Sequence, residues 1–367
     1  KEEEQMVRFT QMNQDLLQSG MKAEIFSGIL APVSTALNNL SYTIIVGVGA
    51  VLILTGGNMS LGIISNFMIY SKQFSRPIQE LANQMSTLLS AVAGAERVFE
   101  VLDAEEEVQD EKDAMELTEV KGNVHFSNVS FSYIEGKPVL KNIEIQAKQG
   151  QTIALVGPTG AGKTTIMNLL MRFYDTEEGT VFVEGKNIRN LKRSNLREQM
   201  GMVLQDTYLF SGTVEENIKY GKQDATQEEV EYAARLANAH DFISRLPQGY
   251  QTPLGDGGGN LSQGQRQMIS IARVMLNNPK ILILDEATSS IDTQTEQKIQ
   301  EAMNVLMQGR TNFVIAHRLS TIRNADKIAV IQHGELKEMG THQELLAKKG
   351  FYYQMYFSQF QDVSGSI

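Results

Sequence analysis

The chain has 367 residues, a length typical of two or three domains, each large enough for its own hydrophobic core. Its 33 basic and 43 acidic side chains give a net charge of −10, which disfavours nucleic-acid binding but leaves room for local basic sites. The absence of cysteine excludes disulfides, zinc–thiolate sites, iron–sulfur clusters and thiol catalysis. The chain opens on Lys1 with no signal-peptide pattern, and we expect it to be part of a longer protein.

Residues 1–104 have the pattern of helices. The run from Ala36 to Leu54 carries no charged residue, and at ~1.5 Å per residue it matches a bilayer core of ~30 Å. An uncharged turn at 55–60 precedes a second apolar run at 61–70. All charges lie away from that turn, which favours a transmembrane hairpin with both distal ends in the cytoplasm. A soluble helical hairpin is the alternative, because the second run is short.

Residues 103–121 are acidic and poorly patterned, which predicts a linker. From Gly122 onward, short β-rich runs alternate with helical patterns, which predicts a largely parallel sheet covered by helices. The expected strands are 124–133, 152–156, 180–183, 201–204, 281–284, 312–315 and 327–331, and the expected helices are 228–239, 263–277 and 295–307.

A glycine-rich loop follows the expected strand 152–156 and opens a helical pattern. Its residues are Gly157, Pro158, Thr159, Gly160, Ala161, Gly162, Lys163, Thr164 and Thr165. This is the G-x-x-x-x-G-K-[ST] phosphate loop in the strand–loop–helix context that its chemistry needs. Its backbone N–H groups and the helix N-terminus would cradle phosphates, Lys163 would neutralise the β- and γ-phosphates, and the hydroxyl of Thr164 would bind Mg²⁺. The sequence therefore predicts an ATP and Mg²⁺ site.

A second nucleotide motif ends the expected strand 281–284. Asp285 and Glu286 follow four apolar residues and would stand at the carboxyl end of the sheet, where ligands gather in α/β folds. We expect Asp285 to hold Mg²⁺ and Glu286 to activate the attacking water. A buried strand ending in Asp is common, but its place downstream of a phosphate loop makes it specific.

Between the two motifs lies the sequence Leu261, Ser262, Gln263, Gly264, Gln265. With the phosphate loop and Asp285–Glu286, it resembles the nucleotide-binding domain of an ABC transporter, and the resemblance covers almost the whole chain. It implies that Tyr133 stacks on adenine and that residues 261–265 contact the ATP held by a partner domain. It also implies that Gln205 reaches Mg²⁺, that Asp292 signals across the dimer, and that His317 is the switch histidine near the γ-phosphate.

Residues 1–102 resemble the last part of an exporter membrane domain: a coupling-helix tail at 1–9, a fifth transmembrane helix from about Gln11 to Leu54, and a sixth from Leu61 to about Leu102. The implied fold is a set of all-α transmembrane helices followed by an α/β P-loop NTPase domain. The expected boundaries are 1–102 for the membrane part, 103–121 for the linker, 122–360 for the nucleotide-binding domain and 361–367 for a tail.

The family's signature corresponds here to residues 261–265. Two departures from the family pattern lie in this signature and just before it. Gln263 occupies a position where glycine is common, and residues 256–260 lack the usual Glu-Arg pair, whereas the other nucleotide motifs are intact. This combination resembles the half of heterodimeric bacterial multidrug exporters that carries the catalytic glutamate. Gln is bulkier than Gly, so Gln263 could hinder approach to a partner-bound γ-phosphate. We favour a heterodimer, and a homodimer that tolerates Gln263 is the alternative.

The implied function is ATP-driven export of drugs, lipids or other amphipathic molecules across the cell membrane by alternating access, with the nucleotide-binding domain in the cytoplasm. The implied partners are a second exporter half, membrane lipid and a small-molecule or lipid substrate, without nucleic acid. Candidate substrate contacts are Asn38, Asn39, Tyr42, Asn66 and Met68, because polar groups at membrane depth usually face a cavity; plain interhelical hydrogen bonding is the alternative. A soluble ABC-type ATPase without transport and an importer ATPase are the competing classes, and the substrate is not determined.

Overall fold

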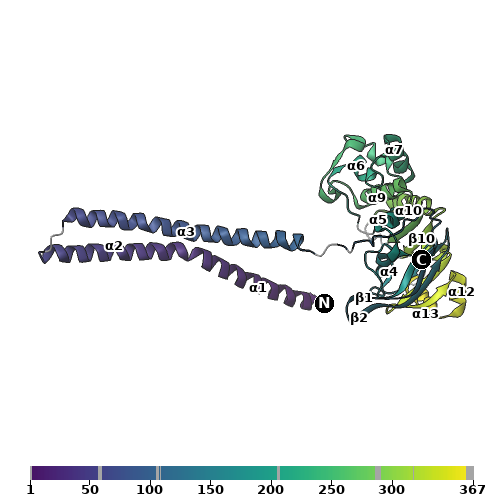
Figure 1. Ribbon diagram of the computed structural model, residues 1–367, viewed down its shortest axis with the longest axis horizontal. Coiled ribbons are helices and arrows are strands. Elements are labelled where there is room, and N and C mark those ends of the chain that lie inside the picture. The colour runs from purple at the N-terminus through teal and green to yellow at the C-terminus, as the bar shows by residue number, and fades with distance from the viewer. Residues whose placement is uncertain are drawn as a thin grey trace. The chain divides into compact units, whose positions relative to one another are not determined.

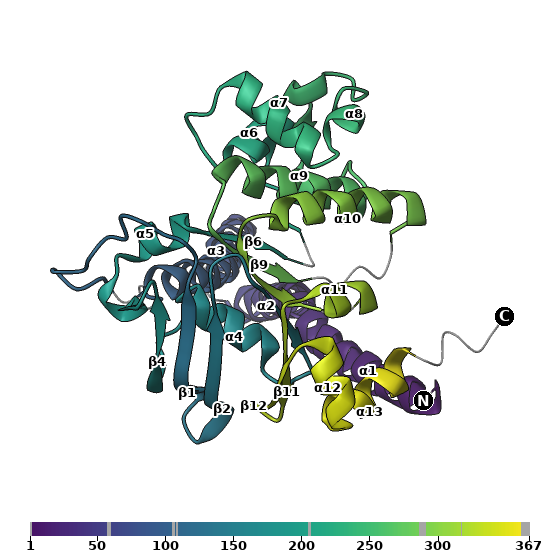
Figure 2. The same cartoon turned by 90° about the vertical axis from the view of Figure 1, so that its right-hand side faces the viewer.

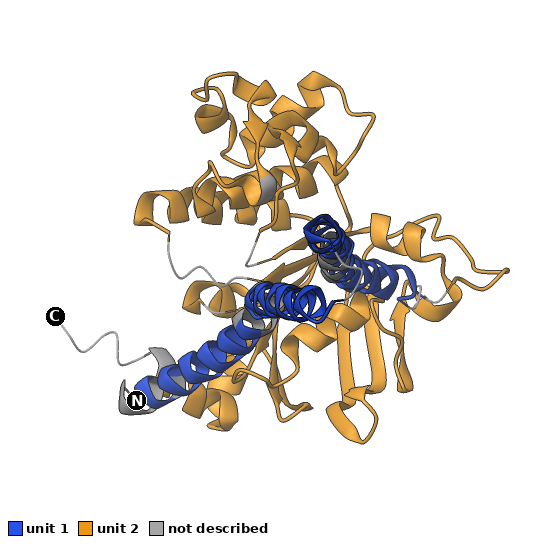
Figure 3. Cartoon of the chain, turned by 90° about the vertical axis from the view of Figure 1, so that its left-hand side faces the viewer, with its two compact units in different colours: residues 1–107 blue, residues 108–367 orange. Residues whose placement is uncertain are grey.

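The computed structural model describes residues 2–56, 60–104, 107, 109–204, 207–285, 291–316 and 318–360. It divides the chain into two compact units, residues 1–107 and residues 108–367 (Figure 3). The division falls within the acidic stretch that follows the last long helix.

The described residues of the first unit form three helices (Figure 1). They are α1 (Glu2–Gly28), α2 (Leu30–Leu54) and α3 (Leu61–Leu102). The structure interrupts the single helix expected from Gln11 to Leu54 at Ile29. Pro32 explains the interruption, because it has no N–H to donate to the carbonyl of Gly28 one turn earlier.

Helices α2 and α3 pack against each other through small residues. A Cβ atom on the buried Gly49 of α2 would lie 2.5 Å from Cδ1 of Ile64 in α3, so glycine permits this close approach. The hydroxyls of Ser41 and Ser71 lie 3.4 Å apart and form a further link between the two helices. The hairpin predicted from the two apolar runs is thus present as a packed helix pair.

Among the described residues, one stretch is long and apolar enough to cross a membrane: Thr35–Leu54, within α2. Only 6% of it is buried inside the structure, so its apolar side chains are not those of a core helix. Leu40, Ile44 and Val51 each expose more than half of their surface. The membrane assignment of α3, which is less apolar, remains a prediction.

The second unit is built on a six-stranded sheet with the order β12-β11-β3-β10-β9-β6. Five of these strands are parallel, and β12 runs antiparallel at one edge. The strands are β3 (Thr152–Val156), β6 (Met200–Val203), β9 (Ile281–Asp285), β10 (Thr311–Ile315), β11 (Lys327–Gln332) and β12 (Glu335–Gly340). β3, which precedes the phosphate loop, lies between β11 and β10.

A second, antiparallel sheet holds two of the strands that the sequence pattern predicts for a largely parallel sheet. Its order is β2-β1-β4-β5, with β1 (Val124–Ile134), β2 (Lys137–Ala147), β4 (Glu178–Val183) and β5 (Lys186–Asn187). The single-sheet expectation for strands 124–133 and 180–183 is therefore wrong. The reason is strand pairing: β1 and β2 form a hairpin through a short turn, and β1 takes the distant β4 as its second neighbour, antiparallel in both cases.

Helices cover the sheets and form a separate lobe. Figure 2 shows α6, α7 and α8 gathered together, with α9 and α10 between them and the strands. The helices are α4 (Lys163–Leu170), α5 (Arg193–Glu198), α6 (Val214–Lys219), α7 (Gln227–Leu236), α8 (His240–Ile243), α9 (Gln263–Asn277), α10 (Thr293–Met307), α11 (Leu319–Asn324), α12 (His342–Lys348) and α13 (Phe351–Phe360). Short 3₁₀ turns lie at Ile188–Asn190, Gly249–Gln251 and Asp256–Gly258, and a two-stranded ribbon pairs β7 (Gly212–Thr213) with β8 (Pro253–Leu254).

Three hydrophobic clusters hold this unit together. The first lies between the two sheets and α4 and includes Phe126, Ile166 and Phe313. The second joins the helical lobe to β9 and β6, and the third packs α11, α12 and α13 against β3 and β11. Because α4 is buried in the first cluster, the loop at its start is held between the two sheets.

Candidate nucleotide-binding site

The loop between β3 and α4 depends on glycines at two close approaches. Gly157 has φ 150°, and a Cβ atom there would lie 2.0 Å from the backbone oxygen of Ile331 in β11. Gly162, the residue before α4, has φ 106°, and its Cβ would collide with Leu140 of β2. Both conformations are disfavoured for residues with a side chain. The glycines of the motif thus let the loop curl between the two sheets.

The loop lines a cavity of about 390 Å³, a size within the usual range for small-molecule sites. Its lining is Val139, Thr159, Gly160, Ala161, Gly162, Lys163, Thr164, Thr165, Asp285 and Ile315. The structure therefore brings together two motifs that lie more than a hundred residues apart in the sequence. Val139 and Ile315 had not been predicted as lining residues, because no local pattern marks a strand side chain that meets a loop from another sheet.

Among the described residues that line this cavity, Lys163 carries the positive charge. Its Nζ donates to the backbone oxygens of Gly157 (2.8 Å) and Pro158 (2.9 Å), so the ammonium group lies over the loop. Burial lowers the pKa of Lys163, because it removes water from the charged form, and the negative charge of Asp285 acts in the opposite direction. An anion entering the cavity would therefore meet an incompletely hydrated positive charge.

The fit to a magnesium nucleotide rests on the donors that the cavity presents. Thr164 is exposed and lines the cavity, and Asp285 stands at the end of β9, beside Ile315 of β10. Hydroxyl and carboxylate oxygens are the ligands that Mg²⁺ prefers. The described residues contain no cluster of three acidic or histidine side chains, so a metal here would complete its shell with phosphate and water oxygens.

Tyr133, predicted to stack on adenine, stands at the edge of the site. Its hydroxyl donates to Oγ1 of Thr165 (3.3 Å) and accepts from Nδ2 of Asn168 (3.1 Å). Its ring packs edge-on against Phe131 and Tyr174, yet 45% of the residue is exposed. An aromatic face is thus held beside α4 and still reachable from solvent. Asn168 and Tyr174 had not been singled out from the sequence.

The signature residues lie at the start of α9. Ser262 is the N-cap: its Oγ accepts from the backbone N–H of Gln265 (3.3 Å), and Oε1 of Gln265 accepts from the N–H of Ser262 (2.9 Å). This reciprocal pair is a capping box, so two of the five residues have a structural role. Leu261 is buried, Gln263 is partly exposed in the first turn, and Gly264 is buried against α10. None of residues 261–265 is among those that line the cavity of the phosphate loop.

Asp292 is the N-cap of α10, and its carboxylate accepts from the backbone N–H of Thr295 at 2.9 Å. Hydrogen bonding to the backbone and side chain of Thr295 lowers the pKa of Asp292, which stays ionised. Gln205, Glu286 and His317, the three residues predicted to act in hydrolysis, lie outside the described residues. So does Ser290.

Comparison with known proteins gives two family matches. Residues 140–289 match the ABC transporter family, and residues 1–78 match the ABC transporter transmembrane region. The first match contains the phosphate loop, the signature and Asp285. The second contains α1, α2 and the first part of α3.

Individual relatives agree with both matches. The uncharacterized ABC transporter ATP-binding protein YfiC of Bacillus subtilis is 52% identical over 361 residues, covering 98% of this chain and 60% of the relative. A fatty acid ABC transporter ATP-binding/permease protein of Mycobacterium tuberculosis is 48% identical over 348 residues, covering 95% and 55%. A solved bacterial Atm1-family ABC exporter with ATP bound superposes with a TM-score of 0.67 at 36% identity, covering 97% and 62%. The chain thus spans 55–62% of the length of these proteins.

Proposed function

This chain belongs to the ABC transporter family, and on that premise we propose that it forms the last membrane helices and the ATP-hydrolysing domain of an exporter. The observation that carries the proposal is the cavity that joins the phosphate loop to Asp285 in a chain that also contains the apolar helix α2. The soluble ABC-type ATPase is disfavoured, because residues 1–78 match a transmembrane region.

Binding of ATP follows from the loop. Its backbone N–H groups and the first turn of α4 attract phosphate oxygens, and the partly buried charge of Lys163 neutralises the β- and γ-phosphates. Tyr133 offers a ring face to the adenine. Thr164 and Asp285 would hold Mg²⁺, directly or through water, and the ion would supply further neutralisation of phosphate charge.

We assign hydrolysis to three residues by their position in the sequence after strands of the six-stranded sheet. Glu286 directly follows Asp285 at the carboxyl end of β9, where it would orient the attacking water and accept its proton. His317 follows β10 and would sense the γ-phosphate, and Gln205 follows β6 and would reach the metal. All three strands are neighbours in the six-stranded sheet, whose parallel strands end on the same side.

Transport would use the first unit. We place α2 and the first part of α3 in the cell membrane, with the second unit in the cytoplasm. Relatives named for fatty acid transport and multidrug resistance support an amphipathic substrate, a drug or a lipid. Asn38, Asn39, Tyr42, Asn66 and Met68 stay our candidate contacts with it, and hydrogen bonding between helices is the alternative role.

The active unit would be a dimer in which residues 261–265 of one half contact the ATP bound by the other, with Asp292 at the junction. The lack of any signature residue in the lining of this chain's own cavity supports such sharing. Gln263 favours a heterodimer, in which this chain supplies the catalytic Glu286 and its partner supplies the common form of the signature. A homodimer remains the alternative.

Replacing Glu286 tests the ATPase assignment. In the full-length transporter, Glu286→Gln should retain ATP binding while steady-state hydrolysis falls by about 10²–10⁴-fold, the usual contribution of a general base. Glu301→Gln, on the exposed side of α10, is the matched control and should hydrolyse ATP at the wild-type rate. Near-normal hydrolysis by Glu286→Gln would show that Glu286 is not the base.

Extraction of cell membranes with alkaline carbonate tests the membrane assignment separately. A protein anchored by α2 stays in the pellet, because its apolar side chains are stable only in the bilayer. Release of the full-length protein into the supernatant would reject the exporter and revive the soluble ATPase.

A further inference from the structure

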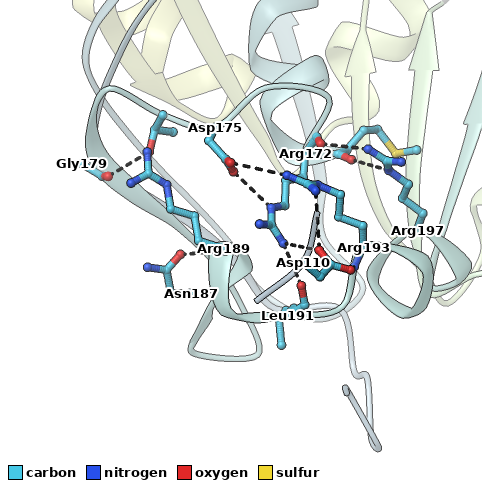
Figure 4. A network of polar contacts seen from close by, with 11 residues as sticks. Asp110, Arg172, Asp175, Gly179, Asn187, Arg189, Leu191, Arg193 and Arg197 are labelled. Atoms are coloured by element: carbon cyan, nitrogen blue, oxygen red, sulfur yellow. Dashed lines mark hydrogen bonds and ion pairs between the residues drawn. The ribbon is translucent and has the colours of Figure 1, made fainter. Parts of the chain in front are cut away.

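Two buried arginines and two aspartates form a charge cluster behind the phosphate-loop helix (Figure 4). Nε of Arg172 donates to Asp175 (3.1 Å), and its Nη1 lies 3.4 Å from Asp110. Arg193 donates its backbone N–H to Asp110 (2.9 Å), and its guanidinium lies within 4 Å of both aspartates. The arginine side chains expose 4% and 10% of their surface, so these charges depend on one another rather than on water.

Arg172 occupies a backbone position where glycine is usual. The N–H groups of Arg172 and Phe173 bond to the carbonyls of Leu169 and Asn168, which is the Schellman arrangement that closes a helix. In this arrangement the residue after the C-cap is left-handed, and Arg172 has φ 52°. A side chain is disfavoured there, so the backbone gains nothing from arginine at this position. What arginine adds is the guanidinium, which joins the end of α4 to Asp110, Asp175 and the carbonyl of Leu191 (2.7 Å).

Asp110 belongs to the connecting segment, residues 109–117, which follows α3 in the chain. The later part of this segment is docked on residues 190–195 without Asp110. Met115 exchanges backbone hydrogen bonds with Asn190 and Lys192, and the N–H of Leu117 donates to Asn195 (2.6 Å). Leu117 is 5% exposed. The bond from Asp110 to Arg172 is thus a second attachment, and it leads directly to the end of α4.

Helix α4 is about 12 Å long, with Lys163 in its first turn and Arg172 just beyond its last residue. We propose that Asp110 is a positioning residue: when phosphate groups draw in the first turn of α4, the Arg172–Asp110 link passes that displacement to the connecting segment and on toward α3. The inference rests on the proposed function, because it assigns a route by which nucleotide binding reaches the membrane helices.

A single reporter on α3 tests the route. Residues 1–367 contain no cysteine, so Glu100→Cys, exposed near the end of α3, accepts one environment-sensitive dye after any cysteine elsewhere in the full-length protein is replaced by serine. The protein is reconstituted in lipid nanodiscs, and the emission shift of the dye is recorded on addition of ATP and orthovanadate. Affinity for a fluorescent ATP analogue is measured in parallel.

We expect Asp110→Asn to lose more than half of the emission shift while its nucleotide affinity stays within about twofold of wild type. Asp110→Glu, which keeps the carboxylate, should recover part of the shift. Asp113→Asn is the matched control: it removes the same charge from an exposed position of the same segment and should respond like wild type. Arg172→Gly breaks the link from the other side with the residue that the backbone prefers there, so it separates the lost link from a folding defect and should also lose the response.

A wild-type shift in Asp110→Asn and Arg172→Gly would overturn the inference. Equal loss of nucleotide binding and of the shift in both variants would also overturn it, because the cluster would then only support the fold. A wild-type protein whose dye does not respond to ATP would instead contradict the proposed function. Hydrogen exchange then tests the attachment by itself: Asp110→Asn should speed exchange in residues 109–114, and unchanged exchange there would reject the link.

Discussion

Lys163 combines a partly buried ammonium group with two backbone hydrogen bonds that phosphate oxygens can replace. Hydrogen bonds to charged groups contribute about 1.5–3 kcal/mol, so Lys163→Ala should weaken binding of a fluorescent ATP analogue by roughly 10–100-fold. Lys137→Ala, at an exposed position at the start of β2, is the control for loss of one positive charge. Unchanged affinity in Lys163→Ala would contradict the assignment of the cavity.

His342 makes the stability of the second unit depend on pH. The hydroxyl oxygen of the fully buried Tyr352 lies 2.7 Å from Nδ1 of His342. Burial raises the pKa of Tyr352 to about 12, so the hydroxyl keeps its proton. Burial, and then the charge of Arg323, lower the pKa of His342 from its ordinary value of 6.5. The neutral ring is therefore the form that fits.

The unfolded chain binds the proton of His342 more readily than the folded chain does. The free energy of unfolding therefore falls as the pH drops below about 6.5, the ordinary pKa of histidine. We expect the melting temperature of wild type to fall between pH 7.5 and pH 5.5 by more than that of His342→Gln, which does not titrate. Tyr352→Phe, which removes the hydroxyl that the ring contacts, should also reduce the dependence of stability on pH. An equal fall in melting temperature between the two pH values for wild type and His342→Gln would refute this role.

The crossing of α9 and α10 depends on Gly264. A Cβ atom there would lie 2.3 Å from Cγ2 of Thr295, and Ile291 and Ile299 close the remaining space. Alanine improves helix propensity by about 1 kcal/mol, but overpacking costs about 1–3 kcal/mol, so we expect Gly264→Ala to lower stability on balance. The measurement is the midpoint of urea unfolding.

Thr295→Ser provides the matched rescue. Serine keeps the hydroxyl and the backbone N–H that serve Asp292 but removes the methyl group that Gly264→Ala would meet. The double variant should recover most of the lost stability. A Gly264→Ala protein as stable as wild type, or a double variant no better than the single one, would show that the helices have room to separate.

In the assembled transporter, the proposed heterodimer predicts two unequal sites. The cavity of this chain would meet the partner's signature and hydrolyse ATP, whereas the partner's cavity would meet Gln263. We expect the partner's cavity to hydrolyse ATP slowly. Gln263→Gly should therefore change nucleotide occlusion in the partner's cavity and leave the main hydrolysis rate nearly unchanged. Occlusion and hydrolysis of the purified complex are the two measurements. Two equal, fully active sites formed by this chain alone would establish the homodimer instead.

The sequence by itself determined the elements that carry the nucleotide motifs. Helix α9 has the predicted bounds, and β9 and β10 differ from the prediction by one residue each. These segments are recognisable because local signals coincide in them: a capping serine before α9, and continuous apolar runs in strands buried on both faces. The phosphate loop was predictable for the same reason, since its glycines, lysine and threonine are neighbours in the chain.

Only the tertiary structure decided which distant segments meet. The placement of β1 and β4 in an antiparallel sheet, the contact of Val139 with the nucleotide cavity, and the link from Asp110 to Arg172 all join residues that no local pattern connects. Strand β2 was not predicted: its second half alternates apolar and polar side chains as a half-buried strand does, but its first half contains lysine, proline and asparagine, which are uncommon in strands. The acidic stretch before Gly122 had no periodicity to reveal its docking, because its attachments are hydrogen bonds and ion pairs to partners about 60–80 residues away. Such contacts form only when the packing of the core brings distant segments together, and no single segment determines that packing.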